Sequence, residues 1–135
     1  TVAVVGAHLS GEPLNWQLTE RGARLVQTTS TSPDYRLFAL AETTPPKPGL
    51  VREPGFAGPG IDVEVWAVPE DAFGSFVGAV PPPLGIGSVR LASGEWVKGF
   101  ICEAAGLAGA RDITDYGGWR AYRHGRMPLA APALR

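Results

Sequence analysis

Cysteine is almost absent from this sequence, which has Cys102 alone among 135 residues. One cysteine excludes an internal disulfide and a cysteine-rich zinc site. Cys102 follows two apolar residues, and we expect it to be a buried small hydrophobic side chain. Histidine is also scarce. The chain has only His8 and His124, the latter near the end of the chain, so we expect no metal site and no cofactor.

Long hydrophobic runs and an excess of charge are missing too. No segment approaches the roughly 18 apolar residues of a membrane span, and no basic-then-apolar leader is present. A net charge of −1 provides no basic surface for phosphate groups, so we expect no nucleic-acid partner. We expect a cytoplasmic protein without a membrane partner. A homo-oligomer is neither indicated nor excluded. Because the chain opens without Met, we expect it to be part of a longer protein.

Glycine and proline, by contrast, are abundant, at 18 and 13 residues. A hydrophobic fraction of 44% and a charged fraction of 19% are typical of a globular protein. At this length the chain forms one domain, which we place at residues 1–123, with a flexible tail at 124–135. Short elements and many turns favour an α+β fold, specifically a small, mixed, mostly antiparallel β-barrel with short flanking helices.

Hydrophobic patterns give the expected elements. A strand is predicted at 1–5, and the alternating segments 23–30 and 35–40 are predicted to pair as an antiparallel hairpin. Further strands are predicted at 61–68, 86–92 and 95–103, the last two as a hairpin, with helices at 69–78 and through Trp119 and Tyr122. Residues 41–60 are rich in proline and glycine, which excludes a helix or a central strand. A long loop of this kind often has a function.

The loop after the first strand carries the strongest candidate for chemistry. Gly6 and Gly11 bound a segment in which the backbone can turn sharply and present its N–H groups. His8 lies between them, and the imidazole can donate or accept a proton near neutral pH. The pattern therefore favours a site for a small anion. A histidine that only hydrogen-bonds a neighbouring carbonyl group fits the same position.

Several blocks of the sequence, taken together, resemble one family. They are VVGAHLSGEPLNWQLTERGA, YRLFAL, TTPPKPGLVR, VEVWAVPEDAFGSFV, PLGIGSVRLASGEWVKGFICE and DITDYGGWRAY. These blocks run from Val2 to Tyr122 and are similar to the C-terminal domain of allophanate hydrolase. The resemblance implies a fold like that of γ-glutamyl cyclotransferase. The catalytic glutamate of the cyclotransferases has no counterpart in residues 76–81, so we do not expect that activity.

The resemblance also implies an enzymatic role in urea degradation and nitrogen metabolism. An N-terminal amidase domain of the same protein would release N-carboxycarbamate, and this domain would promote its decarboxylation. The Ser-Ser-Lys machinery of the amidase is absent here. His8 would be the catalytic residue for a small dianionic substrate. We expect the substrate to be bound by the loop backbone and by cationic and neutral donors: Gly6, Ala7, Leu9, Asn15, Gln17, Tyr35, Lys47 and Lys98. The alternative is a non-catalytic module that stabilises or assembles the amidase domain.

Overall fold

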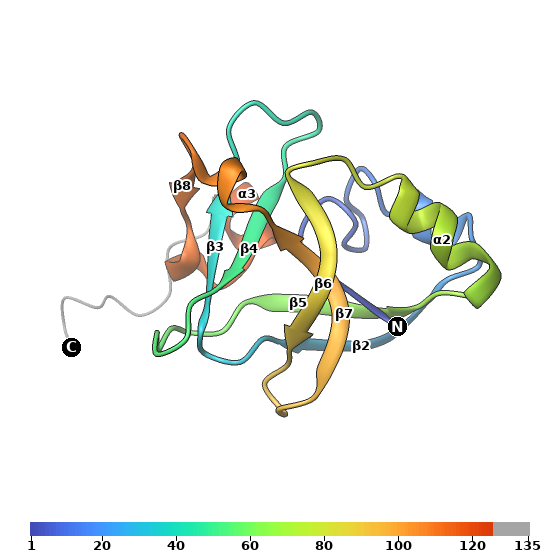
Figure 1. Ribbon diagram of the computed structural model, residues 1–135, viewed down its shortest axis with the longest axis horizontal. Helices are drawn as coiled ribbons and strands as arrows, with labels where there is room; N and C mark the ends of the chain where they lie inside the picture. Colours follow the sequence, from blue (N-terminus) through green and yellow to red (C-terminus); the bar gives the residue numbers. More distant parts are fainter. Residues whose placement is uncertain (126–135) are drawn as a thin grey trace.

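The computed structural model describes residues 1–125 and has two β-sheets with short helices around them (Figure 1). The first sheet has the strand order β2-β5-β1-β7-β6, and the second has the order β4-β3-β8. The strands are β1 (Val2–Val4), β2 (Arg24–Ser30), β3 (Tyr35–Ala39), β4 (Pro48–Arg52), β5 (Asp62–Ala67), β6 (Leu84–Arg90), β7 (Trp96–Cys102) and β8 (Arg111–Asp112). The helices are α1 (Trp16–Thr19), α2 (Glu70–Gly78) and α3 (Trp119–Arg123), with 3-10 turns at Ala104–Leu107 and Thr114–Tyr116.

The sheets confirm the α+β prediction, although the described residues form two separate sheets rather than a closed barrel. β1 lies at the centre of the larger sheet, antiparallel to β5 and parallel to β7, so this sheet is mixed. The apolar sequence of β1 accounts for this position, since all three of its residues are buried. Figure 1 shows β3, β4 and β8 at one side of the molecule and α2 at the other.

The predicted hairpin of residues 23–30 and 35–40 is wrong. β2 pairs with β5 instead, and β3 pairs with β4 and β8 in the second sheet. The intervening residues are held elsewhere: Thr31 donates its N–H to the Ile61 carbonyl oxygen, and Ser32 donates to that of Arg90. These bonds separate the two strands at the point where a hairpin turn would have joined them. The other predicted hairpin is confirmed as β6 and β7.

Residues 41–60 are not a structureless loop, because they contain β4. Pro48 begins this strand, and β4 lies at the edge of its sheet, where a missing N–H is tolerated. Cys102 is partly exposed rather than buried, since it ends β7. The predicted tail at 124–135 lies outside the described residues beyond Gly125. No helix in the part of the chain that the structure describes is long and apolar enough to cross a membrane.

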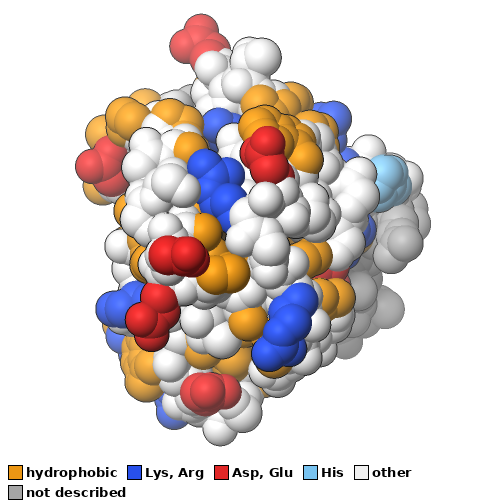
Figure 2. Space-filling model, turned by 90° about the vertical axis from the view of Figure 1, so that its right-hand side faces the viewer, with side chains coloured by type: hydrophobic (Ala, Val, Ile, Leu, Met, Phe, Trp, Pro, Cys, Tyr) orange, Lys and Arg blue, Asp and Glu red, His pale blue; other side chains and the backbone are white. Residues whose placement is uncertain are grey.

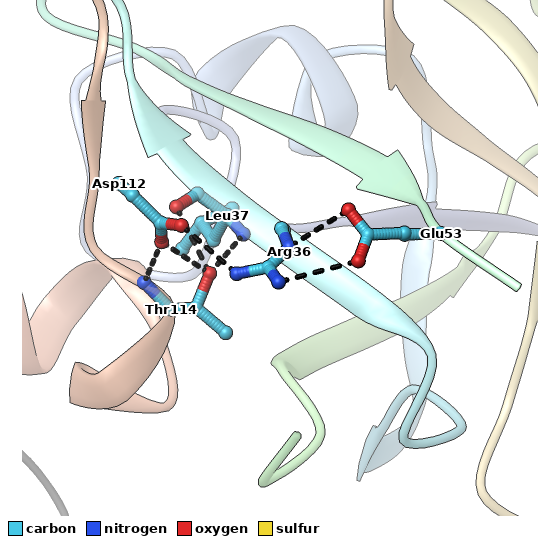
Figure 3. Close-up of polar contacts among 5 residues, drawn as sticks. All are labelled: Arg36, Leu37, Glu53, Asp112 and Thr114. Atoms are coloured by element: carbon cyan, nitrogen blue, oxygen red, sulfur yellow. Dashed lines mark hydrogen bonds and ion pairs between the residues drawn. The ribbon is translucent and has the colours of Figure 1, made fainter. Parts of the chain in front are cut away.

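A polar cluster ties the second sheet together (Figure 3). The guanidinium of Arg36 on β3 forms ion pairs with Glu53, which follows β4, and with Asp112 on β8. The Leu37 N–H donates to the Thr114 hydroxyl oxygen at 2.9 Å. The cluster joins all three strands of the sheet, and its charged members are partly solvated.

Candidate functional site

The loop after β1 is shaped by a sequence of tight turns. Leu9 donates its N–H to the Gly6 carbonyl oxygen, and Leu14 donates to that of Ala7 at 2.8 Å. Gly6 is required by close packing, because a Cβ there would lie 2.2 Å from Cδ of Pro48. The loop of the first sheet and the start of β4 in the second sheet are therefore in direct contact.

His8 is buried, with 7% of its surface exposed, and lies against two aromatic rings. Its ring centroid is 4.8 Å from that of Phe100 on β7 and 5.4 Å from that of Phe76 on α2. His8 Nε2 lies 2.7 Å from Oε1 of Gln17. Since an amide oxygen can only accept, this contact places a proton on Nε2. Nδ1 has no hydrogen-bond partner among residues 1–125 and is the atom left for a ligand.

The surroundings of His8 favour its neutral form. Burial lowers the pKa of the His8 imidazole below its ordinary value, the hydrogen bond to Gln17 opposes this, and the positive charge of Lys47 lowers the pKa further. The His8 imidazole is therefore neutral at pH 7. A negative charge bound nearby would reverse the effect of Lys47 and favour protonation.

Lys47 shares a small cleft with His8. The cleft is lined by Val5, Gly6, Ala7, His8, Lys47, Pro48, Leu84 and Phe100, and it encloses about 10 Å³, enough for about one water molecule. Lys47 is buried at 8% exposure, and in the described part of the chain no carboxylate pairs with its ammonium group. No buried side-chain nitrogen in the described residues lacks a partner, so this ammonium group reaches solvent at the cleft, where a bound anion could pair with it.

The backbone that lines the same cleft also has N–H groups that donate no hydrogen bond. Within residues 1–125, the N–H groups of Gly6, Ala7 and His8 donate no hydrogen bond, whereas the Leu9 N–H is used in the turn. Consecutive free N–H groups in a turn form a concave site for an anion. The cleft thus combines three free backbone donors, one ammonium group and one imidazole, as expected for a small anion.

The other residues that were predicted to bind the substrate do not all lie at the cleft. Asn15 donates from Nδ2 to the His8 carbonyl oxygen at 2.8 Å, and Gln17 holds the imidazole, so both contact His8 rather than line the cleft. Tyr35 is not brought to the site, because its hydroxyl accepts a hydrogen bond from the Arg90 N–H. Lys98 is also elsewhere: it donates to Ser88 and lines a separate pocket beside α2, with Thr1, Val68, Glu70 and Phe73.

One residue near the site was given no role from the sequence. Glu64 on β5 is the only buried acidic side chain in the described region. Its Oε1 accepts from the Ser10 N–H, the Ser10 hydroxyl and the Trp66 indole, and its Oε2 accepts from Arg120. Although burial acts to raise it, these donors hold the pKa of the Glu64 carboxyl below its ordinary value. An alternating sequence such as that of β5 is typical of a strand with one solvent face, so the local sequence carried no signal that Glu64 is buried.

The fold defines the class of the protein: an α+β domain of the γ-glutamyl cyclotransferase-like type, here with a small cleft at its first loop. Residues 1–124 match the model of the allophanate hydrolase C-terminal domain, and the chain belongs to this family. The chain is 55% identical over 124 residues to the urea amidolyase of Saccharomyces cerevisiae, a match that covers 90% of this chain and 7% of that protein.

Solved structures agree with this assignment. Kluyveromyces lactis allophanate hydrolase matches with a TM-score of 0.88 and 50% identity, over 92% of this chain and 21% of that one. A uropathogenic E. coli-specific protein matches with a TM-score of 0.83 and 32% identity, over 93% of this chain and 96% of that one. The chain thus spans a small part of the yeast enzymes and nearly the whole of the bacterial protein.

Proposed function

We propose that this domain promotes the decarboxylation of N-carboxycarbamate, the product that an amidase domain of the same protein would release from allophanate. The observation that supports this most directly is the cleft itself, where the ammonium group of Lys47, which has no carboxylate partner among the described residues, lies with three free N–H groups and an imidazole. N-carboxycarbamate is a small dianion, and its two carboxylates match these two kinds of donor.

The reaction needs one proton at nitrogen. When a C–N bond of N-carboxycarbamate breaks, CO2 leaves and the bonding electron pair stays on nitrogen. A proton delivered there gives carbamate, which then breaks down to ammonia and CO2. A donor placed near that nitrogen lowers the barrier. In this proposal the bound dianion raises the proton affinity of His8, Nδ1 takes up a proton from water, and that proton passes to the nitrogen.

The size of the cleft adds one requirement. About 10 Å³ cannot contain a dicarboxylate, so the rim must open on binding. Among the lining residues, Lys47 has the longest and most flexible side chain, and Leu84 is only half-buried, so these two can move most easily. The same opening and closing would exclude water from the imidazole and strengthen its interaction with the bound charge.

The test supplies N-carboxycarbamate by hydrolysing allophanate in situ with a separate amidase and follows CO2 release. We expect His8→Ala and Lys47→Met to reduce the acceleration by about a hundredfold, within the usual range for a lost proton donor. Lys98→Met is the matched control and should keep the activity, because Lys98 lies at another pocket. Release by His8→Ala at the wild-type rate would refute the proposal.

A non-catalytic role in assembly is the second candidate, and β2 favours it. This strand forms one edge of the five-stranded sheet, and its Leu25 and Val26 are 43% and 50% exposed. An apolar, open strand edge is a ready surface for another protein segment. Charged replacements at Leu25 and Val26 that disrupt assembly with the amidase domain, while CO2 release stays unchanged, would support this role.

A further inference from the structure

The loop that presents His8 is fixed at its far end by a partly buried ionic cluster. Every polar group of Ser10 is bound: its N–H and hydroxyl donate to Glu64, at 2.8 and 3.0 Å, and its carbonyl oxygen accepts from Nη2 of Arg120 at 2.6 Å. The same Nη2 lies 3.1 Å from Oε2 of Glu64. A residue of β5 and a residue of α3 thus converge on one position, two residues after His8.

This arrangement leaves Glu64 unavailable for chemistry. Both of its oxygens are occupied by donors and the side chain is buried, so it cannot serve as an acid or a base for a ligand in the cleft. Its contacts have a different consequence. Together with the packing of Gly6 against Pro48, they hold the loop at both ends and leave the three N–H groups between them free.

We propose that Glu64 and Arg120 are positioning residues of the His8 site, which hold the 6–11 loop in the conformation that presents its N–H groups and imidazole to an anion. Arg120 comes from α3, at the far end of the described chain, so its hydrogen bond to Ser10 joins the first loop to the last helix. The chemical consequence rests on the function proposed above, whereas the effect on the loop does not.

Arg120 gives the sharper test because its side chain is 36% exposed and its replacement leaves no buried cavity. The probe is malonate, a stable dicarboxylate, with its Kd measured by calorimetry on the 135-residue chain. We expect Arg120→Met to weaken malonate binding by about tenfold and to slow CO2 release similarly, the size of effect that a small displacement of reacting groups produces. Arg120→Lys should restore most of both, because a single nitrogen atom makes both contacts.

Arg36→Met is the matched control. It also removes an arginine that bridges two partners, but on the second sheet (Figure 3), and neither Arg36 nor its partners line the cleft, so it should leave malonate binding unchanged. Malonate binding by Arg120→Met that equals wild type would overturn the proposal, as would a failure of lysine to rescue.

Hydrogen exchange separates this proposal from the proposed function. The Leu9 and Ser10 amides should exchange faster in Arg120→Met than in wild type or Arg36→Met, whether or not the domain releases CO2. Unchanged exchange at these amides would refute the positioning role. Wild-type CO2 release by His8→Ala would instead refute only the proposed chemistry.

Discussion

His8 experiences opposing influences on its proton affinity. Burial and the Lys47 charge favour the neutral ring, and the Gln17 oxygen favours the charged ring. An imidazole donates a proton readily only as the imidazolium, whereas the His8 ring is neutral at pH 7. A dianionic ligand corrects this, because its charge outweighs that of Lys47. Protonation is thereby coupled to occupancy of the cleft.

This coupling predicts a pH dependence for malonate binding. The pKa of His8 lies below its ordinary value of 6.5 in the free protein and should rise when malonate binds. The complex then holds more protons than its separate components, so affinity should increase as the pH falls from 8 toward 6, while malonate stays a dianion. Calorimetry in buffers of different ionisation enthalpy measures the proton uptake directly. His8→Gln should abolish the uptake, and an uptake that persists in this variant would assign it to another group.

Individual site residues differ in how far the sequence could reveal them. His8 lies between Gly6 and Gly11, and Lys47 lies between two prolines, in segments that must turn, and the structure brings both to one cleft. Tyr35 and Lys98 were also predicted to bind the substrate, but their strands carry them elsewhere. Tyr35 follows β3 into the second sheet, and Lys98 pairs in register with Ser88 of β6, where its amine is solvated. Strand partners are set by contacts distant in sequence, which local patterns do not contain.

Among the elements, β5 shows this limit most clearly. Its sequence alternates, which is typical of a strand with one solvent face, yet Val63, Glu64, Val65 and Trp66 are all buried. The strand lies between β2 and β1, and the first loop and α3 cover its second face through Glu64 and Arg120. A carboxylate on an apparently exposed face thus became the anchor of the site loop. The existence of the strand was predictable, but its environment was not.

Replacing glycine by alanine should change the stability in opposite directions at two positions, Gly6 in the first loop and Gly74 in α2. Gly6→Ala should cost about 1–3 kcal/mol of unfolding free energy, because the new Cβ would overlap the Pro48 ring. Gly74→Ala in α2 should add about 0.5–1 kcal/mol, because its Cβ meets nothing within 4 Å and the helix gains rigidity. Urea unfolding measures both values. Equal stability of Gly6→Ala and wild type would show that Pro48 can move away from the new Cβ at little cost in free energy.

At the scale of the whole molecule, charges of both signs are interspersed over the face shown in Figure 2, and neither sign forms a continuous patch there. The buried charges behave differently, because they belong to the cleft and its support. Lys47 is left without a carboxylate partner, whereas Glu64 is fully satisfied by donors. The charge of Lys47 is thus left available to the ligand that we propose, whereas that of Glu64 is fully bound within the fold.

Because of Glu64, the unfolding free energy of the protein should depend on pH in the acidic range. Its pKa in the folded protein lies below the ordinary value of 4.5, so its contribution is complete above that pH and is lost as the pH falls through the folded pKa. Glu64→Gln should be less stable than wild type by about 2 kcal/mol at pH 7, the scale of hydrogen bonds to a charged group. The difference should narrow below pH 4.5 in urea unfolding. A difference that is constant from pH 7 to pH 3 would contradict this account.

The cleft draws its parts from both sheets: the imidazole and free amides follow β1, and the ammonium group precedes β4. A molecule that bridges the two would act as a removable cross-link between the sheets, in addition to the packing and the Tyr35–Arg90 hydrogen bond that already join them. Binding of a ligand in the cleft should then slow the opening of β3, β4 and β8 away from the larger sheet. Release of CO2 would cut that link, and each turnover would briefly loosen the domain.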